Sequence, residues 1–295
     1  MKNIVITGAS GVVATELISQ LNQASADYFI YAITTHYNHL RKRYSNNTNI
    51  ECLDLEEFAK KKVHIDVVLH CAFARNGDGK QISSSLQYTQ ILLDIIKEKE
   101  VDYFVYISSQ SVYDGNVPSP RDEKCPISPN SIYALGKYAG ELLTDSSLSK
   151  TSIRYTSLRL ASVGNSARFL NVFVTRAMAE SPIIVMGGGQ KTSFIDVRDV
   201  ASALKGVIDH SSTVEFEHVY NLGANLQRDI LSLAYDVKRI VEKEYGRTVE
   251  IVQQPSDLHL DAGMDSSLFF NTFSWHPQYD YDDMIRSLID LNLKR

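Results

Sequence analysis

The sequence predicts an α/β fold built on a doubly wound parallel β-sheet. Three observations predict it: short apolar runs alternate with amphipathic helical patterns, a glycine-rich turn joins the first run to the first helix, and no linker separates the two halves. Strands that alternate with helices are joined by right-handed crossovers, so the sheet is parallel and helices cover both of its faces. The 295 residues suffice for one large core with a smaller lobe.

The first half of the chain follows this alternation closely. Short runs rich in β-branched and aromatic residues predict strands at 3–8, 28–35, 64–72, 101–109 and 151–161. Apolar residues with helical spacing predict helices at 11–23, 85–99 and 131–146, and a basic helix-like stretch occupies 37–45.

The second half is less regular. Its patterns predict, in order, a helix at 168–180, a glycine turn at 187–189, a helix at 198–209, a strand at 217–221 and helices at 229–244 and 280–292. We expect part of this half to form a smaller lobe against the carboxyl edge of the sheet. Open parallel sheets bind their ligands at that edge.

Composition narrows the class of protein. The net charge of −5 and the pI near 5.9 argue against binding to nucleic acid or to an anionic membrane surface. No apolar run is long enough to cross a bilayer, so we expect no membrane segment. The three cysteines and the histidines lack the spacing of metal ligands, which predicts no metal site and is typical of a reduced, cytoplasmic protein.

A glycine-rich turn follows the first predicted strand. Gly8 permits a tight turn, Gly11 lets a diphosphate approach the backbone, and the small Ala14 allows the strand and the next helix to pack closely. The free N–H groups at the start of that helix then favour an anion. This context predicts binding of a dinucleotide.

Tyr133 and Lys137 lie four residues apart, so they share one face of the helix predicted at 131–146. Taken alone, this spacing is more often a half-buried tyrosine beside a solvated lysine. A phenol has an ordinary pKa of about 10 and is a poor base at neutral pH. An adjacent ammonium group, together with the positive nicotinamide ring of a bound dinucleotide, would favour the phenolate and draw that pKa towards neutrality.

These motifs, in this order, resemble the extended short-chain dehydrogenase/reductase family, which contains nucleotide-sugar epimerases, dehydratases and reductases. The similar segments span nearly the whole chain and are found at 7–14, 54–55, 70–74, 104–115, 133–137, 194–204 and 273–290. The resemblance implies a Rossmann-type domain at 1–165, to which 195–222 returns. A substrate-binding lobe would then comprise 166–194 and 223–295.

The resemblance also implies roles for individual residues. Tyr133 would be the general acid and base, Lys137 would hold the nicotinamide ribose, and Ser109 would orient the reacting oxygen. Residues that would contact the cofactor are Gly8, Ser10, Gly11, Val12, Val13, His36, Arg41, Asp54, Leu55, Cys71, Ala72, Phe73, Tyr133, Lys137 and Ala161. Residues that would contact the substrate are Ser109, Ser162, Arg168, Lys191 and Gln254.

Two departures from the family pattern bear on the reaction. The acidic residue that would select NAD is replaced by Thr34-Thr35-His36, and Arg41-Lys42-Arg43 follows, which favours NADP over NAD as the cofactor. The Asp-Glu pair of the dehydratases is replaced by Gln110-Ser111, and an amide does not exchange a proton in that way, so dehydration is disfavoured.

The substrate implied by the resemblance is a nucleotide sugar, although Thr192-Ser193 and 254–257 lack the arginines that usually hold its diphosphate. Three functions remain open from the sequence. The first is C4 epimerisation by transient oxidation, the second is NADPH-dependent reduction of a keto-deoxy nucleotide sugar, and the third is a non-catalytic dinucleotide sensor or scaffold. The resemblance further implies a homodimer formed by the helix at 131–146 and the long helix before it.

Overall fold

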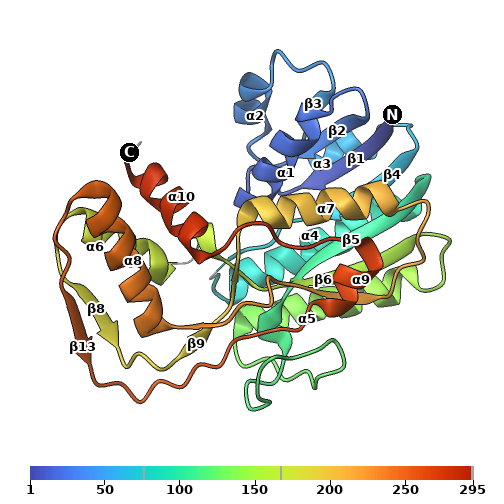
Figure 1. Ribbon diagram of the computed structural model, residues 1–295. Coiled ribbons are helices and arrows are strands. Elements are labelled where there is room, and N and C mark those ends of the chain that lie inside the picture. Colours follow the sequence, from blue (N-terminus) through green and yellow to red (C-terminus); the bar gives the residue numbers. More distant parts are fainter. Residues whose placement is uncertain (76, 167, 294–295) are drawn as a thin grey trace.

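The computed structural model describes residues 1–75, 77–166 and 168–293. A seven-stranded sheet, all of whose neighbours pair in parallel, forms the centre of the larger lobe in the order β11-β6-β5-β4-β1-β2-β3 (Figure 1). Its strands are β1 (Lys2–Thr7), β2 (Tyr28–Ile33), β3 (Ile50–Leu53), β4 (Ile65–His70), β5 (Val101–Ser109), β6 (Arg154–Leu160) and β11 (Val219–Leu222). The predicted doubly wound fold is confirmed. The strand order reverses between β1 and β4, where such sheets open a ligand crevice at their carboxyl ends.

Helices cover both faces of this sheet, as predicted. Those of the larger lobe are α1 (Val12–Gln23), α2 (Tyr37–Arg43), α3 (Leu55–Ala59), α4 (Gly79–Lys97), α5 (Ile132–Leu148) and α7 (Val197–His210). Helices α1 and α7 pack together on one face, and α4 and α5 pack together on the other (Figure 1). The sequence did not predict β3 and α3, because four or five residues are too short to show a periodic pattern.

The smaller lobe has a core of its own. Three helices, α6 (Arg168–Met178), α8 (Ile230–Tyr245) and α10 (Tyr281–Leu293), pack around a two-stranded parallel sheet of β8 (Ile183–Met186) and β13 (Ile251–Gln254). Short pairs join this lobe to the larger one. They are β7 (Ser162–Val163) with β10 (Phe194–Ile195), and β9 (Lys191–Thr192) with β12 (Arg228–Asp229).

The chain returns to the larger lobe near its carboxyl end. Helix α9 (Ser267–Phe273) packs on β11, and its phenylalanines join the main core. The segment between β13 and α9 therefore crosses from one lobe to the other (Figure 1). Single turns of 3₁₀ helix follow β5 and β7, at Gln110–Val112 and Gly164–Ser166. In the described part of the chain, no helix is both long and apolar enough to cross a membrane.

Candidate active site

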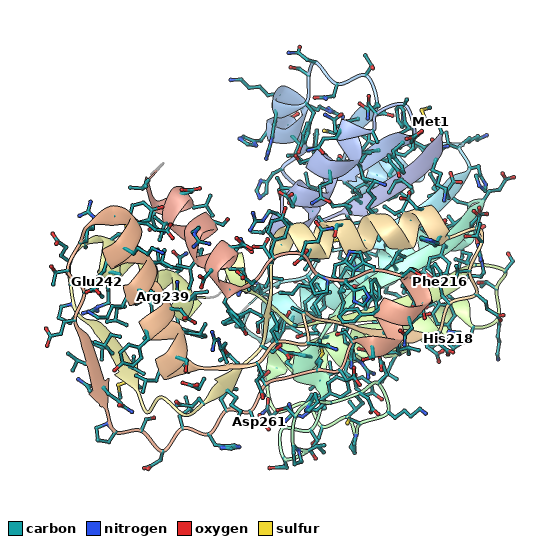
Figure 2. The ribbon with its side chains drawn as sticks, viewed as in Figure 1. Met1, Phe216, His218, Arg239, Glu242 and Asp261 are labelled. Carbon is teal, nitrogen blue, oxygen red and sulfur yellow. The ribbon has the colours of Figure 1, made fainter. Side chains whose placement is uncertain are left out.

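A cavity of about 620 Å³ opens at the carboxyl ends of the central strands, between the two lobes. The glycine turn lines one end, and β5, β6 and the first turns of α5 line the middle. The loop between β5 and α5 lines the other end together with the crossing segment, where Figure 2 labels Asp261. The cavity thus lies in the crevice that the strand order predicts.

The glycine turn fits a diphosphate. Gly8 has a φ of +65°, and a Cβ there would lie 2.8 Å from the backbone N of Ala72, so only glycine suits this position. Gly11 is the N-cap residue of α1 and offers no side-chain cap, which leaves the first N–H groups of the helix available to a ligand. Val12 is 55% exposed beside them. These features suit the phosphates of a dinucleotide.

Ser109, Tyr133 and Lys137 all line the middle of the cavity. Ser109 is the last residue of β5, and Ser131 caps the helix that carries the other two by accepting the Ala134 N–H at 3.1 Å. Lys137 is buried, and its Nζ donates to the Ile107 carbonyl at 2.7 Å. The cavity therefore brings together the three residues to which the resemblance assigns the chemistry.

The charges around Tyr133 differ from expectation. Burial raises the pKa of Tyr133, and a hydrogen bond with Ser109 and the positive charge of Arg75 oppose that rise. Burial also lowers the pKa of Lys137 to about 7. Lys137 is not among the groups that shift the pKa of Tyr133 in this structure. The prediction joined Lys137 with the positive nicotinamide ring of a bound cofactor, and it stays a prediction. A buried lysine loses the hydration that stabilises its charged form, and Arg75 is the cation that acts on the phenol.

A buried ion pair lies beneath these residues. The Arg159 guanidinium donates to both oxygens of Glu141, at 3.0 Å and 2.7 Å, and only 6% and 7% of the two side chains are exposed. Ser108 Oγ also donates to Glu141, at 2.5 Å, and Arg159 donates to the Tyr113 hydroxyl at 3.1 Å. This cluster ties α5 to β5 and β6 directly under the candidate catalytic residues.

The structure brings most, but not all, of the predicted site residues to the cavity. Those that line it are Gly8, Gly11, Val12, Val13, Cys71, Phe73, Ser109, Tyr133, Lys137, Ala161 and Ser162. Among the described residues, those that do not line it are Ser10, His36, Arg41, Asp54, Leu55, Ala72, Lys191 and Gln254. Arg168 begins α6, but its side chain lies outside the described residues.

Two of the residues outside the cavity have structural partners of their own. The carboxylate of Asp54 accepts the Glu57 N–H at 2.7 Å and caps α3. Arg41 Nη2 donates to both oxygens of Glu57, at 2.8 Å and 2.7 Å, and its guanidinium stacks on the ring of Tyr37. Arg41 is therefore engaged in an ion pair rather than directed at a cofactor phosphate.

Several cavity residues were missed by the sequence interpretation. They are Arg75, Tyr113, Arg121, Asn130, Phe169, Phe194 and Asp261. Three of them lie in the polar loop from Tyr113 to Asn130, whose length between β5 and α5 was the one available signal. The others come from segments that only the tertiary fold brings near Tyr133.

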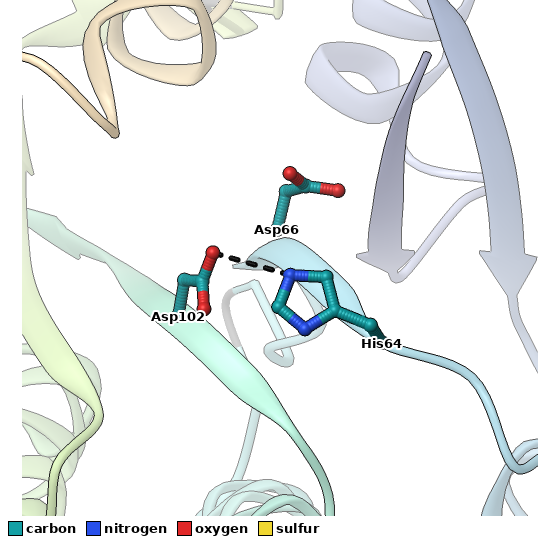
Figure 3. A group of neighbouring side chains, drawn as sticks. All are labelled: His64, Asp66 and Asp102. Carbon is teal, nitrogen blue, oxygen red and sulfur yellow. Dashed lines mark ion pairs between the residues drawn. The ribbon is translucent and has the colours of Figure 1, made fainter.

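One further group of titratable residues lies away from the cavity. His64, Asp66 and Asp102 gather near the amino ends of β4 and β5, and His64 Nε2 lies 3.2 Å from Asp102 Oδ2 (Figure 3). Asp66 already accepts the backbone N–H of Asn3 at 2.7 Å. The half-exposed His64–Asp102 pair is readily explained as a surface ion pair.

Comparison with known proteins agrees with this geometry. The sequence model of the family described as "NAD dependent epimerase/dehydratase family" matches residues 4–223. The chain is 22% identical to dTDP-D-glucose 4,6-dehydratase of Mus musculus, with 98% of this chain and 88% of that protein covered. It is 26% identical to a putative UDP-glucose 4-epimerase of Methanocaldococcus jannaschii, with 97% of each covered.

Solved structures show the same fold. UDP-glucuronic acid 4-epimerase from Bacillus cereus, in complex with UDP-glucuronic acid and NAD, superposes with a TM-score of 0.81 at 21% identity, covering 99% of each chain. UDP-glucose 4-epimerase from Bifidobacterium longum, in complex with NAD⁺ and UDP, gives 0.76 at 22% identity, covering 99% of this chain and 98% of the other. Since the family model spans about three quarters of the sequence and the fold agrees over its whole length, the chain belongs to the NAD-dependent epimerase/dehydratase family.

Proposed function

We propose that the chain is a C4 epimerase of nucleotide sugars that works by transient oxidation. The observation that carries this proposal is the convergence of Ser109, Tyr133 and Lys137 in one cavity whose other end is a glycine turn suited to a diphosphate. The family supports it, and so do the epimerases among the relatives. When bound, the nicotinamide cofactor supplies a reversible hydride acceptor.

The chain's own residues manage the proton and the geometry. Tyr133 takes the proton of the C4 hydroxyl during oxidation. It returns a proton to the keto oxygen after the sugar has rotated to present its opposite face to the cofactor. Ser109 hydrogen-bonds the same oxygen and orients it towards the phenol. Lys137 donates one N–H to the Ile107 carbonyl, so its remaining N–H groups are available to the ribose hydroxyls of the cofactor.

Dehydration remains disfavoured. Gln110 occupies the position where the dehydratases carry an acid, and its Nε2 donates to Ser162 Oγ at 3.2 Å. The Gln110 amide thus links the end of β5 to Ser162 after β6, and an amide does not transfer a proton as a carboxylic acid does. The test is product analysis with UDP-glucose and UDP-glucuronate: an epimerase forms the C4 epimer without net change of cofactor. A reductase and a sensor form no product from these C4 alcohols, and only the reductase oxidises NADPH when a 4-keto nucleotide sugar is supplied.

For the cofactor we propose NAD, against the preference for NADP that the sequence favoured. That preference depended on the lack of an acidic residue at Thr34-Thr35-His36 and on the cations of Arg41-Lys42-Arg43. Of these cations, Arg41 is instead paired with Glu57 and does not line the cavity. The NAD bound in the solved relatives supports the same choice. With Arg41 engaged, the case for a reductase that uses NADPH loses one of the three cations on which it depended.

Substitution of Glu57 tests this choice. We expect wild-type protein to bind NADH more tightly than NADPH, and Glu57→Gln to strengthen NADPH binding by about fivefold or more, because the freed guanidinium can pair with the 2′-phosphate. Fluorescence titration with both cofactors measures the ratio. Glu56→Gln, on the same turn, is the matched control. Preference for NADPH in the wild type would contradict the proposal.

We also propose that the protein is a homodimer formed by α4 and α5. These helices pack together, and their apolar residues Ile91, Ile132, Leu135 and Leu142 are 45%, 56%, 58% and 52% exposed. The three residues of α5 fall on one face of that helix. An exposed apolar face of this kind fits contact with a second copy of itself.

Charges placed on this face test the dimer. The double substitution Leu135→Glu and Leu142→Glu should raise the dimer dissociation constant by about 100-fold or more, because four carboxylates would be buried without partners. Sedimentation velocity measures the change. Leu258→Glu, at a residue that is 66% exposed in the crossing segment, should leave the dimer intact. A wild-type protein that sediments as a monomer would refute the proposal.

The cellular compartment is proposed on chemical grounds. Cys52, Cys71 and Cys125 are all free thiols in the described structure. Free thiols are typical of a reducing compartment. We therefore propose that the protein acts in the cytoplasm.

A further inference from the structure

Arg121 is a buried cation that lines the cavity from the loop between β5 and α5. It is only 6% exposed. Lys137 and Arg75, which also line the cavity, act on the cofactor and on Tyr133, whereas the proposed mechanism gives Arg121 no role. A positive charge placed at this depth requires a partner.

The hydrogen bonds of Arg121 leave part of its guanidinium unused. Its Nε, Nη1 and Nη2 each donate to a backbone carbonyl, those of Asp114, Asp261 and Gly115, at 3.1, 2.8 and 3.2 Å. Arginine has five N–H groups. One N–H on each terminal nitrogen therefore has no acceptor among the described residues. Carbonyls hold the group in place without neutralising its charge.

The neighbouring carboxylate does not take up these groups. Asp261 also lines the cavity, but its oxygens accept from Ser119 N at 2.9 Å, from Ser119 Oγ at 2.5 Å and from Gln227 Nε2 at 3.0 Å. Its only bond with the guanidinium is made by its backbone carbonyl. Burial raises the pKa of Asp261, but hydrogen bonds with Ser119 and Gln227 and the charge of Arg121 lower it below its ordinary value, so the two charged groups attract each other. No carboxylate oxygen of Asp261 accepts from the guanidinium, whose two remaining N–H groups stay available to a ligand.

Asn130 adds a second donor at the same place. Its Nδ2 lies 3.9 Å from the position that a Cβ on Gly115 would occupy, and the Gly115 carbonyl accepts from Arg121. The Asn130 side chain is exposed, lines the cavity and makes no hydrogen bond with the described residues. A guanidinium and an amide thus offer free N–H groups to the cavity.

We propose that Arg121 and Asn130 form a subsite for a carboxylate on the sugar of a nucleotide-sugar substrate. This inference rests on the proposed function and narrows its substrate to a nucleotide hexuronate. A carboxylate offers only acceptors and carries a negative charge, so it matches a fork of free N–H groups on a buried cation better than a hydroxymethyl group does. Arg121 is then a specificity-determining residue.

Calorimetric titration of the NAD-loaded protein with UDP-glucuronate and UDP-glucose tests this subsite, because the two sugars differ only in the carboxylate or hydroxymethyl group. We expect tighter binding of UDP-glucuronate. Arg121→Met should raise the dissociation constant of UDP-glucuronate about 30-fold or more and that of UDP-glucose less than about threefold. Arg121→Lys keeps the charge without the fork and should give an intermediate loss.

Two further variants separate the subsite from the fold. Asn130→Asp changes an exposed residue, so it should not disturb folding. Charge repulsion should selectively weaken the binding of UDP-glucuronate. Lys124→Met removes an exposed cation from the same loop outside the cavity and should change neither affinity. Equal wild-type affinities, equal losses for both sugars, or failure to bind either sugar would overturn the subsite. Selective binding without epimerisation would instead refute the proposed function.

Discussion

Tyr133→Phe is expected to lower the rate of epimerisation by about a thousandfold while the affinity for NAD stays within about twofold of the wild type. The phenol oxygen is the only atom removed, and the proposed mechanism gives it the proton of the C4 hydroxyl. The glycine turn, which we expect to hold the phosphates of NAD, does not involve this atom, so the binding of NAD should be retained. Steady-state assays, together with fluorescence titration of NADH, measure the two effects separately.

A second tyrosine on the same helix provides the control. Tyr138 lies on α5 five residues beyond Tyr133 but does not line the cavity, so Tyr138→Phe should keep near-normal turnover. If Tyr133→Phe also kept near-normal turnover, another group would be the proton carrier. Equal losses in both variants would indicate damage to the helix rather than to the chemistry.

Loss of the buried carboxylate of Glu141 is expected to cost about 3–5 kcal/mol of unfolding free energy. Glu141→Leu leaves the guanidinium of Arg159 buried without its counter-charge, and Ser108 loses its acceptor as well. Arg159→Met should lower the unfolding free energy by a similar amount, because it leaves the Glu141 carboxylate buried without its counter-charge. Urea denaturation followed by circular dichroism measures each loss.

The double variant distinguishes a paired charge from general packing. With both charges gone, Glu141→Leu with Arg159→Met should cost clearly less than the sum of the single losses, by about 2 kcal/mol or more. The surface ion pair of Arg286 with Glu244, in which two guanidinium nitrogens donate to the carboxylate, is the matched control. Glu244→Gln should lower the unfolding free energy much less, because water screens this pair. Additive losses would show that the two charges are not coupled.

Local patterns in the sequence predicted the parts of the fold that depend on neighbouring residues. The strand predicted at 101–109 coincides with β5, and the helix predicted at 131–146 is α5 with its end two residues later. Both have a full period of apolar side chains. Gly8 and Gly11 lie within one turn of chain, so their place between β1 and α1 followed from their spacing together with the strand and helix predicted around them.

Contacts between distant segments could not be predicted in this way. The partner of Arg159 is 18 residues away on another element, and Arg121 meets the carbonyl of Asp261 across 140 residues. Arg41 was expected to face a phosphate because its sequence position allowed it, but packing placed it beside Glu57 on α3, a helix too short to be foreseen. Direction and partner of a charged side chain depend on the tertiary fold.

Deuterium at C4 of the nucleotide sugar tests hydride transfer within the cavity most directly. The protein is incubated with NAD and C4-deuterated UDP-glucose or UDP-glucuronate in ordinary water, and the product is examined by mass spectrometry and NMR. The proposed mechanism predicts a C4 epimer that retains the deuterium at C4, and almost none of it in Tyr133→Phe. An epimer that carries hydrogen from water at C4, or the absence of any epimer in the wild type, would contradict it.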